Sequence, residues 1–254
     1  MASPLAQFEI HQLAPLSLAG HDVAFTNSAL WMVTVLGLIW IFMLGGMRKA
    51  ALVPGRWQVA VEQVYGFIDN MAGTNIGPEG KRFVPLLFSL FMFILVANFA
   101  GLMPLGVVPH GHAFTVTSHL TVTGILAVIA FGTVLVVGFA RHGLHFFSLF
   151  VPHGIPVVMV PMLFVIELVS FLFRPFSLGL RLFVAMTAGH ILLKVLAGFI
   201  VSLGTLGGPA LIVTIPTLAL LIGISALELL VSAIQAYVFA LLTSLYLNDA
   251  VNLH

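Results

Sequence analysis

The sequence predicts an all-α integral membrane protein with five crossings, a long and tilted C-terminal antiparallel helix hairpin, and one amphipathic surface helix. Of its 254 residues, 61% are hydrophobic and only 7% are charged. Soluble domains are about one-quarter charged, so this chain has too few polar groups to cover a surface that faces water. Its solvent is therefore predicted to be lipid.

Five apolar segments are long enough to cross the hydrocarbon, which takes about 20 helical residues. The turn around Gly207 and Gly208 is predicted to join the last two into the hairpin. No internal repeat or low-complexity linker is visible, so residues 1–254 are predicted to form a single membrane domain. The predicted segments are 23–47, 83–108, 113–140, 155–203 and 209–247.

Residues 57–72, between the first two spans, have the pattern of an amphipathic helix. Such a helix is predicted to lie on the membrane surface, where an ordinary anchoring connector is the simplest interpretation. Its apolar face comprises Trp57, Val61, Val64, Ile68 and Met71, and its polar face comprises Gln58, Glu62 and Asp69.

Basic residues predict the orientation. The connection at 48–82 holds five Lys or Arg residues, Arg141 follows the third span, and neither end of the chain has any. Cytoplasmic loops carry an excess of Lys and Arg, so the N-terminus is predicted outside and the C-terminus inside.

The 155–203 tract can cross the membrane once or twice. Two crossings would place Arg174 and Arg181 in an outside loop, against the charge bias. One long, tilted helix keeps that bias and puts Arg181 at membrane depth. We therefore predict five crossings, with six as the alternative.

Ionisable residues at membrane depth cost roughly 2.5–3.5 kcal/mol or more, so each is a candidate for function. In an antiparallel hairpin, residues equally far from the turn lie at the same depth. This geometry places Arg181 opposite Gln235, and His190 opposite Glu228 nearer to the turn. Gln235 alone could instead simply bridge helices.

A histidine beside a carboxylate is a candidate proton relay, because imidazole titrates near neutral pH and the pair titrates as one unit. Arg181 cannot release its proton, so it is predicted to act as a gate that attracts an ionised carboxylate. The structural alternatives are an ion pair between Arg181 and Glu167 and a buried His190–Glu228 pair. Glu167 is either a proton exit or a partner of Arg174.

Other polar residues give weaker signals. Lys194 is expected to extend toward the interface. Loop histidines are usually solvated, so no metal site is predicted. The chain has no Cys, no basic run typical of nucleic-acid binding and no predicted cofactor. The loop histidines are His110, His112, His119, His142, His145 and His153.

Three strings resemble the subunit a family of F-type ATP synthases. They are RPFSLGLRLFVAMTAGH from Arg174, ALELLVSAIQAYVFALLTSLYL further along, and FVPLLFSLFMFILVANFAGLMP in the second span. The resemblance implies a stator subunit that forms two proton half-channels against a rotating ring of small hairpin subunits, each with one carboxylate. Proton flow would be coupled to ATP synthesis on other subunits, and peripheral stalk subunits would be further partners.

The resemblance also implies roles for individual residues. Arg181 matches the arginine that faces the ring, and Gln235 matches the glutamine that faces this arginine. The remaining matches are His190, Glu228 and Asn98 in the outside half-channel, and Glu167 and Ser170 in the inside half-channel.

Two positions depart from the family pattern. Ala185 stands where many members have Asn, which suggests a differently wetted outside channel. Gly101 stands where some members have Asp. The expected location is the bacterial inner membrane rather than the mitochondrial one. The alternative functions are a secondary ion-coupled transporter, disfavoured by the lack of an inverted repeat, and a membrane anchor, which needs no titratable pair at depth.

Overall fold

The structure is a computed structural model in which helices predominate. Two short strand pairs near the N-terminus are additional to the predicted helices: β1 (Gln12–Ala14) pairs with β4 (Phe25–Thr26), and β2 (Ser17–Leu18) pairs with β3 (His21–Asp22), both antiparallel. The described residues are 12–14, 17–18, 21–22, 25–48, 51, 53–103, 115–150, 159–206 and 211–252.

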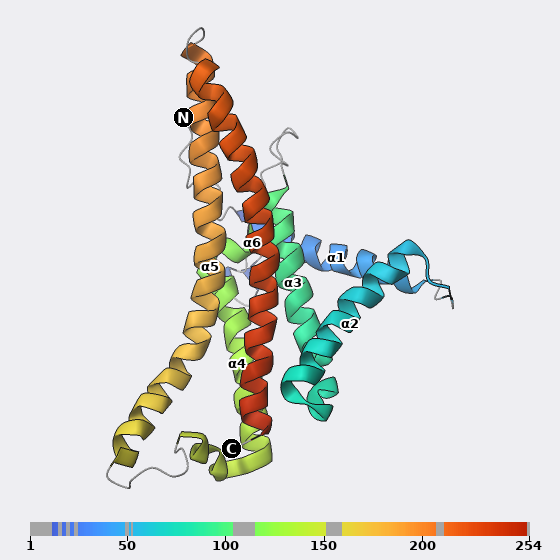
Figure 1. Ribbon diagram of the computed structural model, residues 1–254, viewed down its shortest axis with the longest axis vertical. Coiled ribbons are helices and arrows are strands. Elements are labelled where there is room, and N and C mark those ends of the chain that lie inside the picture. The colour runs from blue at the N-terminus through green and yellow to red at the C-terminus, as the bar shows by residue number, and fades with distance from the viewer. Residues whose placement is uncertain are drawn as a thin grey trace. The chain divides into compact units, whose positions relative to one another are not determined.

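Among the described residues, five helices are long and apolar enough to cross a membrane, which confirms the predicted fold class. These are α1, α3, α4, α5 and α6 in Figure 1. In chain order the helical elements are α1 (Asn27–Met47), α2 (Arg56–Ile76), the 3-10 helix η2 (Pro78–Arg82), α3 (Val84–Leu102), η4 (Val116–Ser118), α4 (Leu120–His142), η5 (Gly143–Phe150), α5 (Val160–Leu206) and α6 (Leu211–Val251).

Helix α5 answers the question of five or six crossings. It has 47 residues and continues through Pro175 and Arg181 without interruption, as Figure 1 shows. Proline in a helix removes one backbone hydrogen bond and usually kinks the helix, but here it does not end it. The RPFSLGLR segment is therefore not an outside loop.

The start of the third span was predicted too early. Helix α4 begins at Leu120 rather than at 113, after the short turn η4. The hydroxyl of Ser118 donates to the Thr115 carbonyl at 2.6 Å, and Thr117 donates to Asn98 at 2.7 Å. Such side-chain hydrogen bonds compete with helix formation, which explains the later start.

Several predicted features fall outside the described residues. These are the start of the first span at 23–24, the end of the second span from 104 onward, the turn at Gly207 and Gly208, and the loop residues His110, His112 and His153.

Contacts between Cα atoms divide the chain into two compact units. Whether residues 1–254 form one membrane domain stays a prediction. Unit 1 comprises Met1–Ile39, Phe93–His119 and Leu182–Gln235, and unit 2 comprises Trp40–Met92, Leu120–Arg181 and Ala236–His254.

In unit 2, the amphipathic helix α2 packs its apolar face against protein. Ile68 is fully buried, and Phe67 contacts Tyr237 of α6 with ring centroids 5.5 Å apart. Asn75 Nδ2 donates to Ser244 Oγ at 2.8 Å. The amphipathic pattern is thus confirmed, while the position of α2 at the membrane surface stays a prediction.

An aromatic cluster in unit 2 joins α4, η5 and the first part of α5. Phe171 of α5 lies 4.9 Å from Phe131 of α4 and 5.3 Å from Phe150 of η5, measured between ring centroids. Offset and edge-on ring pairs of this kind contribute about 0.5–1.5 kcal/mol each beyond burial. They fix the part of α5 that carries Glu167 and Ser170.

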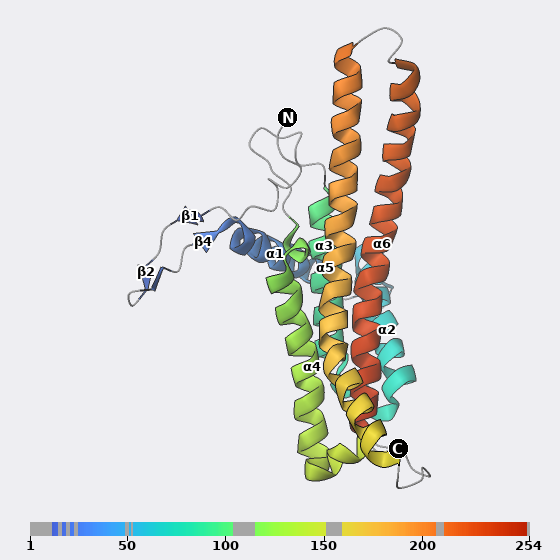
Figure 2. The same ribbon diagram turned by 90° about the vertical axis from the view of Figure 1, so that its left-hand side faces the viewer.

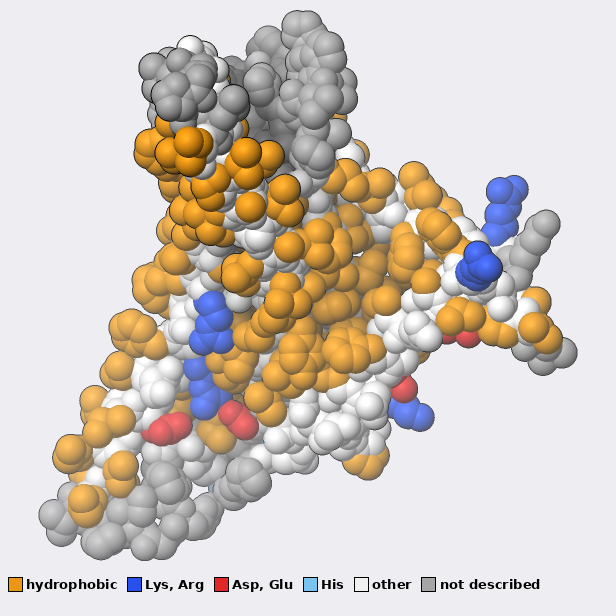
Figure 3. Space-filling model, turned by 45° about the horizontal axis from the view of Figure 1, so that its top comes forward, with side chains coloured by type: hydrophobic (Ala, Val, Ile, Leu, Met, Phe, Trp, Pro, Cys, Tyr) orange, Lys and Arg blue, Asp and Glu red, His pale blue; other side chains and the backbone are white. Residues whose placement is uncertain are grey.

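Unit 1 contains the ends of α5 and α6 nearest the turn, which run side by side in both views (Figures 1 and 2). A small apolar core of Val35, Ala97 and Ala100 joins α1 to α3. Large hydrophobic side chains elsewhere are exposed, including Trp40 at 71% and Val136 at 68%, and Figure 3 shows how they predominate on one face.

Replacing Ile68 by Ala is expected to lower the free energy of unfolding by about 2–5 kcal/mol, because it leaves a cavity under α2. The measurement is the unfolding transition of the detergent-solubilised complex. Ile129→Ala is the matched control, since Ile129 on α4 is 48% exposed and its loss leaves no cavity. Equal stability of the two variants would contradict the packing of α2 described above.

Candidate functional site

Unit 1 buries a cluster of polar side chains within membrane-spanning helices. Hydrocarbon supplies no hydrogen-bond partner, so polar groups at this depth must satisfy one another. The cluster draws on α3, the turn η4, α5 and α6. Its members are Asn98, Thr115, Thr117, Ser118, His190, Glu228 and Ser232.

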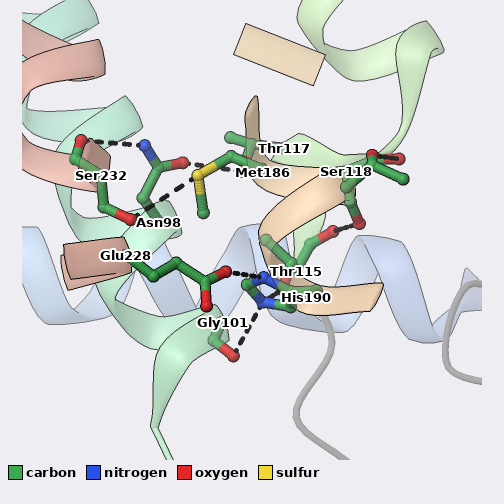
Figure 4. Close-up of polar contacts among 10 residues, drawn as sticks. Asn98, Gly101, Thr115, Thr117, Ser118, Met186, His190, Glu228 and Ser232 are labelled. Carbon is green, nitrogen blue, oxygen red and sulfur yellow. Dashed lines mark hydrogen bonds and ion pairs between the residues drawn. The ribbon is translucent and has the colours of Figure 1, made fainter. Parts of the chain in front are cut away.

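His190 and Glu228 form the centre of this cluster. His190 Nδ1 of α5 lies 2.6 Å from Glu228 Oε1 of α6, and the two side chains are only 8% and 4% exposed. Figure 4 shows the carboxylate directed at the imidazole ring. The contact expected from the hairpin geometry is therefore present.

The other face of the imidazole meets α3 and the segment before η4. His190 Nε2 lies 3.2 Å from the carbonyl oxygen of Gly101 and 2.5 Å from the hydroxyl oxygen of Thr115 (Figure 4). The Thr115 hydroxyl can donate to Nε2 or accept from it, whereas the Gly101 carbonyl can only accept, so both oxygens hold this side of the ring.

This arrangement can hold one exchangeable proton between two groups. With Nε2 protonated, the pair exists either as imidazolium and carboxylate or as neutral imidazole and carboxylic acid. The two forms differ only in the position of one proton on the line from Nδ1 to Oε1. Glu228 Oε2 is buried and has no hydrogen-bond partner among the described residues.

Asn98 belongs to a second network that borders the first. Its amide oxygen accepts from Thr117 at 2.7 Å, and its Nδ2 donates to the Ser232 carbonyl at 3.2 Å. The Ser232 hydroxyl in turn donates to the sulfur of Met186 at 3.6 Å. Both ends of the Asn98 amide are thus occupied, and they tie η4 and α6 to α3 beside the histidine.

Two glycines make room for the pair. A Cβ atom on Gly189 would lie 2.5 Å from Glu228 Oε1, and a Cβ atom on Gly101 would collide with the Thr115 side chain. The carboxylate can therefore lie against α5, and the threonine against α3, because these positions have no side chain.

Unit 2 contains a separate ion pair. Arg174 of α5 pairs with Asp249 of α6 at 2.7 Å, and its guanidinium lies 5.0 Å from the Tyr246 ring centroid. One interpretation of the sequence paired Arg174 with Glu167, but Arg174 pairs with Asp249 instead. Glu167 is half-buried and forms no ion pair among the described residues, and Ser170 is exposed.

Arg181 is exposed on α5 and forms no ion pair in the part of the chain that the structure describes. The alternative of an ion pair with Glu167 is thus absent. Gln235 is buried, and its Nε2 has no hydrogen-bond partner among the described residues. Arg181 belongs to unit 2 and Gln235 to unit 1, and their predicted contact stays a prediction.

The remaining titratable candidates lie apart from the pair. Lys194 is exposed on α5. Burial lowers the pKa of His119, just before α4, so its imidazole is neutral near pH 7. His142 Nε2 lies 3.3 Å from the Val251 carbonyl in unit 2. Within the described ranges, no three His, Asp or Glu side chains gather as metal ligands would.

Sequence reasoning missed Thr115, Thr117 and Ser232 as parts of the site. Their signal was the concentration of hydroxyl side chains in otherwise apolar tracts. A hydroxyl at membrane depth also bonds readily to its own helix, so its type alone did not identify a partner.

The fold and this cluster define a class: a multi-pass membrane protein with a buried, titratable histidine–carboxylate pair. The family model described as ATP synthase A chain matches residues 29–248. The chain is 68% identical over 254 residues to ATP synthase subunit a of Rhizorhabdus wittichii, covering 99% of this chain and 97% of the relative. It is 46% identical over 254 residues to the subunit a of Rhodospirillum rubrum, with both chains covered fully.

The chain therefore belongs to the ATP synthase A chain family. It is a membrane-sector subunit and not one that catalyses ATP formation. The family identified from the sequence strings is confirmed.

Replacing Thr117 by Val is expected to destabilise the protein by about 1–3 kcal/mol, because the buried Asn98 oxygen loses its donor. The measurement is thermal unfolding of the solubilised complex. Thr34→Val makes the same chemical change at an exposed hydroxyl that bonds only to the Leu30 carbonyl of its own helix. If Thr117→Val and Thr34→Val unfold at the same temperature, the Asn98 network contributes nothing to stability.

Proposed function

We propose that this chain is the stator against which a ring of small hairpin subunits rotates, and that it forms two offset proton half-channels. Flow through these channels is coupled to ATP synthesis on other subunits of the complex. Peripheral stalk subunits hold the chain against the ring. Membership of the ATP synthase A chain family supports this role over a secondary transporter or an anchor.

The observation that carries the proposal is Arg181. It is an exposed cation without a described ion pair, on a helix whose neighbouring exposed side chains are apolar, such as Phe176 at 59% and Val184 at 54%. A permanent charge facing lipid alone is costly. A partner that brings a carboxylate to this face removes the cost, and a ring of carboxylate-bearing subunits does so at each step of rotation.

The outside half-channel runs past Asn98, His190 and Glu228. The direct 2.6 Å contact of His190 with Glu228 supports it, because a single proton can move along this line. The free Oε2 of Glu228 is the atom that exchanges with the ring carboxylate or with channel water. Asn98 borders the path and holds its walls together.

The inside half-channel runs past Glu167 and Ser170. Asp249 neutralises Arg174, so the nearest basic residue along α5 does not capture the Glu167 carboxylate. Glu167 therefore stays available to receive a proton from the ring.

The cycle follows from these parts. A proton from the outside neutralises a ring carboxylate, which can then face lipid at tolerable cost. Rotation brings a protonated site to the inside channel, where the proton leaves. The resulting carboxylate is attracted to Arg181, which prevents backward movement. Gln235 faces Arg181, and because its amide is neutral it does not cancel the charge of the arginine. The driving force is about 2.3 kcal/mol per proton per 100 mV.

The membrane is the bacterial inner membrane, with the N-terminus outside and the C-terminus in the cytoplasm. The clustering of basic residues between α1 and α3 supports this orientation. The relatives named above are bacterial.

Replacing Arg181 by Ala is expected to abolish proton-driven ATP synthesis, because the ring carboxylate loses its attracting charge. The measurement is ATP formation by energised membrane vesicles that contain the assembled complex. Arg56→Ala removes an exposed arginine from α2 and should leave synthesis intact. Normal synthesis by Arg181→Ala would refute the stator role.

Exchanging the two members of the pair tests their coupling. His190→Glu combined with Glu228→His should restore more synthesis than either single change, because the double variant rebuilds one acid beside one imidazole. The rates of all three variants are compared with wild type in the same vesicles. Strictly additive losses would argue against direct coupling.

A further inference from the structure

We propose that Thr115 is a positioning residue: together with the Gly101 carbonyl it holds the Nε2 side of the His190 ring, so that Nδ1 faces Glu228 and the relay exchanges protons at that contact. This inference rests on the proposed outside half-channel. It adds a specific role for two positions that the sequence strings did not identify as partners.

The geometry places two oxygen atoms at the same ring nitrogen. Thr115 Oγ1 is 2.5 Å and the Gly101 carbonyl oxygen is 3.2 Å from Nε2. When Nε2 carries a hydrogen, it can donate to these oxygens, and when it does not, the Thr115 hydroxyl can donate to it. In both cases the ring is held with Nδ1 facing Glu228 Oε1.

The Thr115 hydroxyl is free for this task. Thr115 is the N-cap of η4, a position at which a hydroxyl usually bonds to the turn that follows. Here it makes no such capping bond, and its backbone is extended, with φ −90° and ψ 107°. The carbonyl of Thr115 instead accepts from Ser118 at 2.6 Å, which fixes the residue while its side chain points at His190.

Gly101 complements Thr115. A Cβ atom at position 101 would lie 2.7 Å from Thr115 Cγ2 and 2.8 Å from its Cβ, and still closer to its Oγ1. Threonine therefore reaches the histidine only when position 101 has no side chain. Gly101 contributes its carbonyl as one acceptor and leaves the space that the second acceptor occupies.

The proton balance of the relay is simple under this arrangement. When the pair gains a proton, that proton lies on the carboxyl group or on the imidazole, and it moves between them along the line from Nδ1 to Oε1. When that proton leaves, neutral imidazole and carboxylate remain. Both forms require the ring orientation that Thr115 and Gly101 hold.

Few other charges act on the pair. Among the described segments of unit 1, α1 and α3 carry no titratable side chain, and α6 carries only Glu228. Lys194 lies one turn along α5 from His190, and His119 follows η4. A change in the pH dependence of proton flow on altering Thr115 therefore reports on the pair.

The experiment measures passive proton flow through the membrane sector in vesicles from which the catalytic subunits have been washed off, as a function of the pH on the outside face. Thr115→Val removes the hydroxyl and keeps the shape, Thr115→Ser keeps the hydroxyl, and Gly101→Ala displaces it. Thr34→Val is the matched control, and His190→Ala is the reference for a broken relay.

The amount of assembled complex is measured for each variant. Thr115→Ala replaces the valine variant if the latter fails to assemble.

Thr115→Val and Gly101→Ala are each expected to lower the flow about tenfold, the effect of losing a hydrogen bond to a charged group. They should also displace the midpoint of the pH dependence by at least about half a unit, because the ring is no longer held with Nδ1 facing Glu228. Thr115→Ser and Thr34→Val should keep both properties. A purely structural defect would lower the flow by the same factor at every pH and would leave the midpoint unchanged.

The possible failures are distinguishable. If His190→Ala conducts protons normally, the proposed outside half-channel is refuted, and so is the positioning role of Thr115. If His190→Ala is inactive while Thr115→Val keeps the wild-type flow and midpoint, the half-channel stands and only the positioning role is overturned. Equal losses in Thr115→Ser and Thr115→Val, with an unchanged midpoint, also overturn it.

Discussion

The hydrogen bond between His190 and Glu228 determines much of what surrounds it. Hydrocarbon offers no hydrogen-bond partner, so an imidazole and a carboxylate can be buried inside a membrane only if they bond to each other or to other polar groups. Meeting at 2.6 Å, they fix the height of α5 against α6 within unit 1. Three neighbouring features make this geometry possible. Gly189 and Gly101 leave the space it needs, and the Thr115 hydroxyl contacts the ring.

The two arginines of α5 illustrate opposite solutions to the same constraint. Arg174 and Arg181 are seven residues apart, about two helical turns, and therefore lie on similar sides of the helix. Arg174 is satisfied within the chain by Asp249 and by the rings of Phe171 and Tyr246. Arg181 has no described carboxylate of its own. The first joins two helices, and the second is the cation to which the proposed function assigns a partner subunit's carboxylate.

Much of the fold could be predicted because apolar length and helical period are local properties. The five spans and the amphipathic helix were found in this way, and so was the single long helix through Pro175. The histidine–carboxylate contact also followed, since an antiparallel hairpin relates depth to distance from its turn. The ion pair between Arg174 and Asp249 was missed because nothing in the sequence around Asp249 indicates which cation it meets.

The turn before α4 was missed for a related reason. A threonine at membrane depth can bond to its own helix, as Thr133 does, or to another segment, as Thr115 and Thr117 do. The choice depends on whether α3 and α5 present an acceptor or a donor there, which is a property of the folded chain. A sequence pattern reports the hydroxyl but not its partner.

The continuity of α5 has a mechanical consequence. Its 47 residues form one continuous hydrogen-bonded helix, with Arg181 near its middle. The part of α5 in unit 2 is held by the Phe131–Phe171 contact, and the part in unit 1 is held by the His190–Glu228 bond. A break at the RPFSLGLR segment would have left a hinge beside the charged group, where the proposed stator has to stay stiff.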